Sequence, residues 1–543
     1  MKKIISLTLI TTLSLGLVAC TSNNQKDANA SDATALSSMR IINGHLEDST
    51  TDDKYRTTYE VFVYSFCDSD GDRVGDINGL ISKLDYIDEL GCNGIWLMPV
   101  MPSPSYHKYD ITDYKNIDSA YGTLDDFSNL VNECHDRGID LYIDFVMNHT
   151  SSQHPWFKEA VEYLSSLEEG QDIDYEACKY VQYYNFITEP KNGYAPVPGT
   201  DNRFYYECRF VSEMPDVNLD SAAVMDEYKD IAKFWYDLGV DGYRMDAVTS
   251  YYTEDTQASI NVLSEFAEYV HGLDPNLYIV TEAWTAADTY DRYLESGVDS
   301  TFEFEFSQAE GYIAKALNTG KASTYAKHLD PSVKGLRAYN EAAIPAPFYT
   351  NHDTARTGGY YTGEFATQKA KMGWAMSLTM TGNSFLYYGE ELGMRGSGDD
   401  ENKRQAFLWC DDTNAKGMAT ALKATKNIDN RLGSLKQQQD DGDSIYNFVK
   451  EVIRIRNSSP VISHGEAVFV EEASTDSCCV VEKEYQDKKM WLLYNVGAES
   501  QTIDLSKIKG EATIYGAALT NYSVLSIEDD AISVPGYSLV IIE

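Results

Sequence analysis

The chain of 543 residues is predicted to be an α/β protein: a (β/α)8 TIM barrel with a domain inserted after its third strand and a C-terminal antiparallel β-sandwich domain. Short apolar runs typical of strands recur along most of the chain, separated by stretches of helical length. One connection, after the third run, is far too long for a single helix. After about residue 460 the pattern changes to closely spaced short strands, which indicates a separate antiparallel domain.

Eight apolar runs have the length and residue types of strands buried in a parallel sheet. The segments between them carry helical patterns, as in residues 77–90, where Leu80, Leu84 and Leu90 fall on one face. Eight such units close into a barrel whose functional residues lie at the carboxyl ends of the strands. The predicted strands are 60–66, 94–99, 140–146, 241–246, 278–282, 301–306, 346–350 and 383–388.

Changes in these patterns give the domain boundaries. We predict a catalytic barrel at 55–460, an inserted domain rich in aromatic residues at about 149–215, and a C-terminal domain at 461–543. Within the C-terminal domain, strands are expected at 479–483, 489–496, 511–515 and 537–542.

The first 20 residues have the features of an export signal. A positively charged start precedes an apolar run at 4–18, which is shorter than the ~20 residues of a membrane-spanning helix. The run ends in Leu-Val-Ala-Cys20, which resembles the lipobox of bacterial lipoproteins, so Cys20 is the expected lipidation site. Residues 21–54 then form a flexible linker. We expect a protein anchored by lipid to the extracellular face of the cell membrane; an ordinary secretory signal is the alternative.

The composition limits the partners. With 43% hydrophobic residues the chain can build a large core, and its net charge of −41 repels the phosphates of nucleic acid, which is not an expected partner. A neutral polymer feels little of this repulsion, and a monomer is expected. Of the nine cysteines, those other than Cys20 have no metal-ligand spacing, and both disulfides and buried thiols remain open.

Charged side chains follow several of the predicted strands. Asp246, Glu282 and Asp353 would meet at one mouth of the barrel. One such carboxylate is often a rim ion pair, but the whole set indicates a catalytic site. Paired carboxylates suit acetal cleavage, in which an acid protonates the leaving oxygen and a carboxylate faces the developing oxocarbenium ion. A separation of about 5 Å gives retention of configuration, and about 6.5–9.5 Å gives inversion.

These segments resemble the signature regions of the α-amylase family of glycoside hydrolases, in the same order and on the corresponding strands. The resemblance extends over about residues 55–456 and is closest to members intermediate between the oligo-1,6-glucosidase and neopullulanase branches. The matching segments are 144–149, 242–247, 282–284 and 351–353, with 214–218 similar to a further motif near the end of the family's inserted domain.

The resemblance implies a role for each matching residue. Asp246 matches the nucleophile, Glu282 the general acid/base and Asp353 the carboxylate that stabilises the transition state. Arg244 would keep Asp246 ionised, whereas Glu282 has to be protonated and so needs a raised pKa. The residues that match sugar-binding positions are His107, Tyr109, His149, Arg244 and His352; Asp144 and Asn148 match structural positions, and Trp284 is a candidate for stacking on sugar.

A second group of oxygen donors follows the first predicted strand. Asp68, Asp70, Asp72, Val74 and Asp76 alternate along a tight loop that contains glycine, as a Ca2+ site requires. The loop lacks the sixth-position glycine and the final glutamate of an EF-hand. A similar loop binds calcium in the oligo-1,6-glucosidase-like branch of the family, so we expect a structural Ca2+; an acidic solvated loop is the alternative.

The expected activity is that of an α-amylase: retaining, endo-type hydrolysis of α-1,4-glucosidic bonds in starch, glycogen and maltooligosaccharides, through a covalent glucosyl intermediate on Asp246. Ala247 favours α-1,4 specificity, because α-1,6-specific members resemble one another in having valine there, and Met214 favours the amylase-like members. The alternatives are a 4-α-glucanotransferase, an exo-acting α-glucosidase or a neopullulanase-like enzyme. A non-enzymatic alternative is a glucan-binding surface protein on the same fold.

Overall fold

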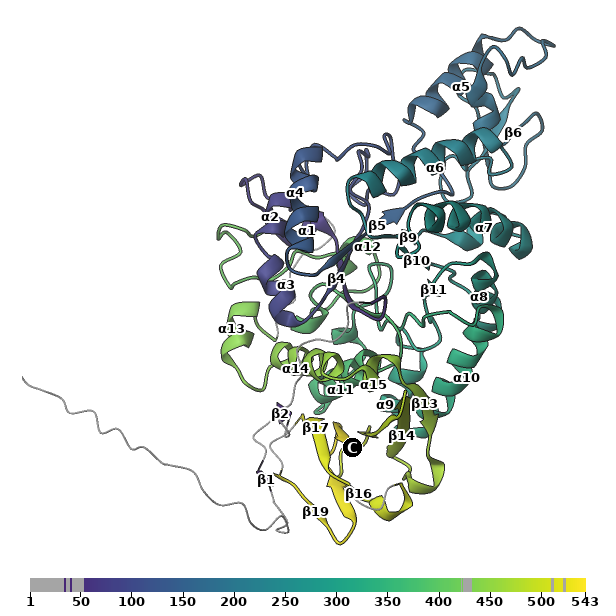
Figure 1. Cartoon of the computed structure of the whole chain (residues 1–543). Coiled ribbons are helices and arrows are strands. Elements are labelled where there is room, and N and C mark those ends of the chain that lie inside the picture. Colours follow the sequence, from purple (N-terminus) through teal and green to yellow (C-terminus); the bar gives the residue numbers. More distant parts are fainter. Residues whose placement is uncertain are drawn as a thin grey trace, which may run out of the picture.

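The computed structural model describes residues 34–35, 40–41, 53–420, 422, 432–508, 512–520 and 524–543. Cys20, the predicted signal peptide and most of the predicted linker lie outside these residues. In Figure 1 the barrel occupies the centre, the inserted segment extends from one side, and the yellow C-terminal strands lie at the opposite end. None of the helices in the described ranges is long and apolar enough to cross a membrane.

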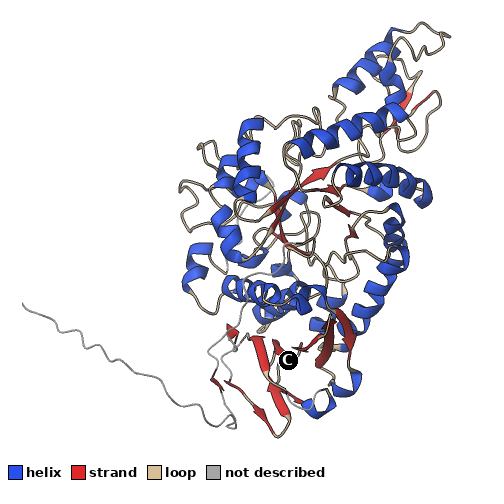
Figure 2. Ribbon diagram, in the orientation of Figure 1, coloured by secondary structure: helices blue, strands red, loops and turns tan. Residues whose placement is uncertain are grey.

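Parallel strands form the centre of the large domain, with helices around them (Figure 2). Their order is β11-β10-β9-β5-β4-β3-β12. Between β11 and β12, Ala346 forms a parallel bridge with Phe302 and Phe348 forms one with Phe385, so residues 346–348 take the place of the remaining barrel strand. The strands are β3 (Thr57–Val61), β4 (Gly94–Leu97), β5 (Asp140–Phe145), β9 (Gly242–Met245), β10 (Tyr278–Thr281), β11 (Ser300–Thr301) and β12 (Ser384–Tyr387).

The predicted first strand was misplaced. Strand β3 begins at Thr57 and ends at Val61, and the second half of the predicted segment 60–66 forms the short helix α1 (Val63–Phe66). The apolar run at 61–64 has neither the period of a strand nor that of a helix, so its pattern could not reveal the change.

The predicted strand at 346–350 is reduced to isolated bridges. Pro345 and Pro347 have no N–H to donate, so at these two positions the segment offers only carbonyl oxygens, which accept from the backbone N–H groups of Asn383 and Phe385. The predicted barrel is nevertheless confirmed as a fold class.

The surrounding helices pack their apolar faces on the barrel. Helix α4 is typical: Thr123 and Asp126 form a capping box at its start, and it buries Phe127 and Leu130. The longer helices of the barrel domain are α3 (Leu84–Leu90), α4 (Leu124–His135), α6 (Ala222–Asp237), α7 (Thr256–Leu273), α9 (Tyr312–Thr319), α10 (Ser323–Tyr339), α11 (Ala366–Leu378) and α14 (Ile445–Asn457). Shorter ones are α2 (Ile77–Ile81), α8 (Ala287–Tyr290), α12 (Asp400–Lys403), α13 (Leu435–Asp440) and α15 (Pro460–His464).

The long connection after β5 forms a small unit of its own. An antiparallel bridge between His149 and Asp216 joins its entrance to its exit, and a second bridge joins Tyr184 to Val217. The wall of the barrel mouth is therefore built partly from this inserted domain. It contains α5 (Pro155–Ser166), a 3-10 turn (Lys179–Tyr183) and a small antiparallel sheet of β6 (Phe186–Ile187), β8 (Tyr205–Glu207) and β7 (Tyr194–Pro196).

The C-terminal domain is antiparallel, as predicted. Its larger sheet has the order β13-β14-β15-β21-β17-β2 and a smaller one the order β16-β20-β19, and buried side chains such as Val480, Leu493 and Ile532 form a common core. The strands are β13 (Glu466–Phe469), β14 (Cys478–Tyr485), β15 (Lys488–Asn495), β21 (Ser538–Ile542), β17 (Ile514–Ala518), β16 (Gln501–Asp504), β20 (Ala531–Val534) and β19 (Ile527–Glu528).

Two short strands come from the segment predicted as a linker. Strand β2 (Arg40–Ile41) pairs with β17, and β1 (Thr34–Ala35) pairs with β18 (Val524–Leu525). The N-terminal segment thus adds edge strands to the C-terminal domain. The cysteines of the described residues are all free thiols.

Candidate active site

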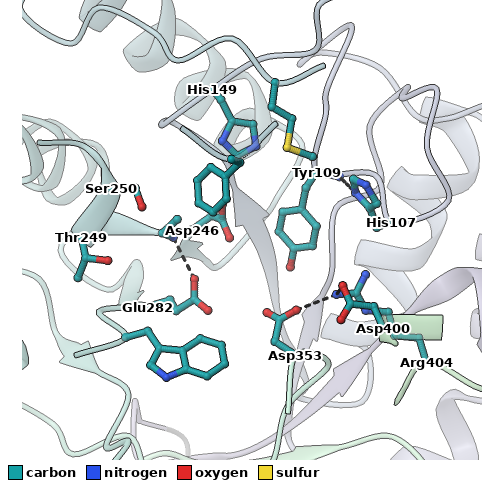
Figure 3. A pocket seen from close by; sticks show the side chains of 14 residues that line it. His107, Tyr109, His149, Asp246, Thr249, Ser250, Glu282, Asp353, Asp400 and Arg404 are labelled. Carbon is teal, nitrogen blue, oxygen red and sulfur yellow. Dashed lines mark hydrogen bonds and ion pairs between the residues drawn. The ribbon is translucent and has the colours of Figure 1, made fainter. Parts of the chain in front are cut away.

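A cavity of about 470 Å³ opens at the carboxyl ends of the barrel strands (Figure 3). All three proposed catalytic carboxylates, Asp246, Glu282 and Asp353, line it. The first two directly follow β9 and β10, and Asp353 follows the segment that bridges to β12. The structure thus brings together residues that are spread over more than 100 positions of the chain, because parallel strands end at the same mouth of the barrel.

Arg244 is the charged centre of this site. Its side chain is fully buried; Nη1 donates to Asp144 Oδ1 at 2.9 Å and to Asp246 Oδ1 at 2.5 Å, and Nη2 lies 3.0 Å from Glu282 Oε2. Sheet register explains the first contact, because Asp144 on β5 is the partner of Arg244 on β9. One guanidinium therefore holds both candidate catalytic carboxylates at the same cavity and offsets the cost of burying them.

Glu282 has the properties of a proton donor. Burial raises its pKa to about 7; the charge of Arg244 opposes this shift, and the charges of Asp246 and Asp353 add to it. The backbone N–H of Ala247 donates to Glu282 Oε2 at 3.1 Å. Ala247 has a φ of 46°, an unusual backbone conformation for a residue with a Cβ, and such strain is concentrated at functional sites.

Asp353 is held in the ionised state by two cations. His352 Nε2 lies 2.9 Å from its Oδ2, and Arg404 Nη2 donates to its Oδ1 at 2.7 Å. Although burial raises the pKa of Asp353, the charge and hydrogen bond of His352 and the charge of Arg404 lower it well below its ordinary value. Burial lowers the pKa of His352, but Asp353 and Glu60, whose Oε1 lies 2.6 Å from Nδ1, raise it to about 9.

Three of the five predicted sugar-binding residues line the cavity, whereas Arg244 and His352 are fully buried and do not line it. His107, Tyr109 and His149 line the cavity, and the Tyr109 hydroxyl donates to Asp144 Oδ2 at 2.9 Å and lies 2.8 Å from His352 Nε2. The Nε2 atom of His149 is buried and has no hydrogen-bond partner among the described residues. Because buried polar atoms are normally paired, this atom is suited to bind a polar ligand group.

Several residues of the cavity were not predicted. Asp400, the first residue of α12, and Arg404, directly after that helix, reach it from the segment that follows β12, and Phe210 reaches it from the inserted domain. They carry no periodicity and no motif, and only their contacts in the folded chain place them at the site. Thr249 and Ser250, a short distance after Asp246, complete this unpredicted set.

The acidic loop lies outside this cavity. Carboxylate oxygens of Asp68, Asp70 and Asp76 lie within 4.8 Å of one another, a donor set that fits Ca2+. Asp72 is not part of this group, and its Oδ1 accepts instead from the backbone N–H of Val74 at 2.7 Å. The structure thus brings together three of the four predicted carboxylates.

Comparison with known proteins identifies the family. The alpha-amylase catalytic domain model matches residues 60–465, about three quarters of the chain. The chain belongs to the α-amylase family of glycoside hydrolases. The resemblance inferred from the sequence is thereby confirmed, and the protein is a family 13 glycoside hydrolase.

Individual relatives carry different names. Alpha-amylase 3 of Dictyoglomus thermophilum is 36% identical over 460 residues, covering 84% of this chain and 88% of that protein. The solved structure of Eubacterium rectale Amy13B has a TM-score of 0.87 and 46% identity, covering 93% of this chain and 97% of that one. The oligo-1,6-glucosidase of Bacillus cereus is 26% identical over 530 residues, covering 83% and 92% of the two chains.

We predict that kcat/KM of this hydrolase falls as the pH rises above about 7. As the predicted general acid, Glu282 would act in its protonated form, and its raised pKa keeps the proton in place up to about pH 7, above which the protonated fraction falls about tenfold per unit. The pH dependence of kcat/KM on maltotriose measures this decrease at alkaline pH. The decrease should be absent from the residual activity of Glu282→Gln. A constant kcat/KM up to about pH 9 in the native enzyme contradicts the assignment.

Proposed function

We propose that this glycoside hydrolase is a retaining, endo-acting α-amylase that cleaves α-1,4-glucosidic bonds in starch, glycogen and maltooligosaccharides. The observation that carries the proposal is the guanidinium of Arg244, which contacts both Asp246 at 2.5 Å and Glu282 at 3.0 Å. Two carboxylates on one guanidinium are close neighbours, which favours the spacing of about 5 Å of a retaining pair over the wider inverting one.

In the first step of the proposed mechanism, Asp246 attacks the anomeric carbon while Glu282 gives its proton to the leaving glycosidic oxygen. The bond between that carbon and oxygen breaks, and a glucosyl ester forms on Asp246. Glu282 then removes a proton from water, the water oxygen attacks the same carbon, and Asp246 is released as a carboxylate. Two inversions give a product with the configuration of the substrate.

The remaining residues act on the bound sugar. Asp353 is ionised, and a negative charge at the cavity wall stabilises the positive charge that develops at the anomeric carbon. Tyr109 offers an aromatic face, and His107 and His149 offer ring nitrogens to sugar hydroxyls. His352 is fully buried and acts on Asp353 instead, because its charge keeps that carboxylate ionised.

Two features support α-1,4 specificity. Ala247 follows the nucleophile and Met214 lies in the cavity wall, as expected for amylase-like members, and one relative carries the name alpha-amylase. Because another relative is named oligo-1,6-glucosidase, an exo-acting α-glucosidase is an alternative to the proposed α-amylase. A 4-α-glucanotransferase would use the same residues and differ in its acceptor. The complete set of carboxylates in one cavity argues against a protein that only binds glucan.

We also propose that the enzyme is a monomer held on the extracellular face of the cell membrane by a lipid on Cys20. The support is the apolar N-terminal run that ends in the lipobox-like Leu-Val-Ala-Cys20. Such an anchor suits the attack on a polymer that is too large to be imported.

We predict distinct product patterns for the rival activities. A time course on amylose should give mixed short maltooligosaccharides before glucose, because an endo enzyme cuts within the chain, and NMR should detect the α-anomer first. Asp246→Asn should lower kcat by roughly 10³-fold or more, while Asp237→Asn at the exposed end of α6 leaves it unchanged. Glucose alone, products longer than the substrate, or the β-anomer as first product would each refute the proposal.

We further propose a structural Ca2+ in the loop of Asp68, Asp70 and Asp76. The ion would screen the mutual repulsion of these carboxylates and hold the loop that leads into α2. Chelation is therefore predicted to lower the Tm of the native enzyme, and Asp70→Asn should lower it without chelator and abolish the further effect of chelation. Asp85→Asn, at an exposed carboxylate on α3, is the control. Equal Tm values with and without chelator would exclude the ion.

A further inference from the structure

The inserted domain carries a second groove, outside the catalytic cavity. Its volume is about 640 Å³, and it lies between the small β6-β8-β7 sheet and the first turn of α6. Ligand sites in proteins have volumes of roughly 300–1,000 Å³. The groove is thus large enough to hold a few sugar units.

Aromatic rings form much of its lining. Tyr175 is 52% exposed, which makes it the most exposed large apolar side chain of the described residues. Phe186 and Tyr194 are partly buried along the same groove, and Tyr184 is buried beneath them. Aromatic rings gathered in a concave surface provide flat apolar faces, and such exposed faces mark binding sites.

Most polar side chains of the lining are neutral, and several of them are amides. Gln182 and Asn185 use their N–H groups to bind Tyr175 O and Glu207 Oε2, and their side-chain oxygens have no hydrogen bond within the described part of the chain. The lining contains no lysine or arginine, and its one carboxylate, Asp220, accepts from the Tyr252 hydroxyl at 2.6 Å. Hydroxyl groups are suitable partners for these acceptors, and the lining itself offers no positive charge to an anionic ligand. A cation does lie beside one lining ring, because Lys191 Nζ is 5.2 Å from the centroid of the Tyr194 ring.

The groove and the catalytic cavity share a wall. The hydroxyl of Tyr184 lies 2.8 Å from Thr150 Oγ1, and Thr150 directly follows His149, which lines the catalytic cavity. The backbone of Tyr184 also bridges to Val217, next to the Asp216 that pairs with His149. A chain held in the groove is therefore bound to the same inserted domain that forms part of the cleavage site.

We propose that this groove is a second, non-catalytic binding site for a neutral α-glucan chain, an inference that rests on the proposed function. A glucan presents apolar sugar faces to the rings of Tyr175 and Tyr194 and hydroxyl edges to Gln182 and Asn185. The site retains the polymer beside the catalytic cavity between cleavage events. Short oligosaccharides that fill only the catalytic cavity do not depend on it.

The test uses the inactive background Glu282→Gln, so that the polymer stays intact during affinity electrophoresis in gels that contain amylopectin. Adding Tyr175→Ala should weaken the apparent affinity by roughly three- to tenfold, the effect of losing one stacked ring. Tyr339→Ala, which removes a ring of 42% exposure at the end of α10, is the matched control and should migrate like the parent.

A second variant tests the groove without removing a ring. Ala223→Glu puts a charged side chain into the groove, and an acidic residue suits the first turn of α6, so the helix is not weakened. It should weaken binding as Tyr175→Ala does. In the active enzyme, both single variants should hydrolyse maltotriose at the native rate and lose activity on amylopectin at low polymer concentration.

Native migration of both groove variants, with amylose hydrolysis intact, overturns the second site and leaves the proposed function standing. Failure of the native enzyme to hydrolyse amylose overturns the proposed function itself. If Tyr339→Ala loses as much affinity as the groove variants, the retardation comes from nonspecific binding to exposed aromatic rings, and the proposed glucan site in the groove is refuted.

Discussion

The site depends on one buried cation. Arg244 contacts Asp144, Asp246 and Glu282, and removing its charge would leave these buried carboxyl groups without a cation. The same contacts fix the directions in which Asp246 and Glu282 point. A second cationic arrangement, in which His352 and Arg404 hold Asp353, keeps the third carboxylate charged while Glu282 retains its proton. Carboxylates of one cavity thus take opposite protonation states.

The barrel, the inserted domain and the C-terminal domain have different roles. The barrel delivers the reacting groups, and the inserted domain adds walls to the cavity and carries the groove beside it. The C-terminal sheets lie at the far end from the inserted domain, and Lys483 on β14 fastens them to the barrel through the carbonyls of Thr379 and Ile462. Burial lowers the pKa of Lys483 well below its ordinary value. Lys483 does not line the catalytic cavity, so its contacts belong to the packing of the two domains.

The sequence allowed functional residues to be predicted where a charged residue directly follows the apolar pattern of a strand. Asp246 and Glu282 directly follow apolar strands, and the geometry of a parallel barrel then brings them to one mouth, so both could be identified beforehand. Arg404, Phe210 and Tyr175 lie on irregular segments, whose course depends on contacts far along the chain. The bounds of β3 were not predicted correctly, because a short apolar run has no period that marks where the strand begins and ends. The predicted strand at 346–350 forms only isolated bridges, because its prolines have no N–H to donate.

In the proposed mechanism, Asp246 attacks the anomeric carbon beside a protonated Glu282. Mass spectrometry of peptides from enzyme treated with a fluorinated glucosyl fluoride, which slows the breakdown of a glycosyl ester, tests this attack. We expect one added sugar, on the peptide that contains Asp246. Labelling of Asp353 or Asp144, or turnover with no covalent adduct at all, would contradict it.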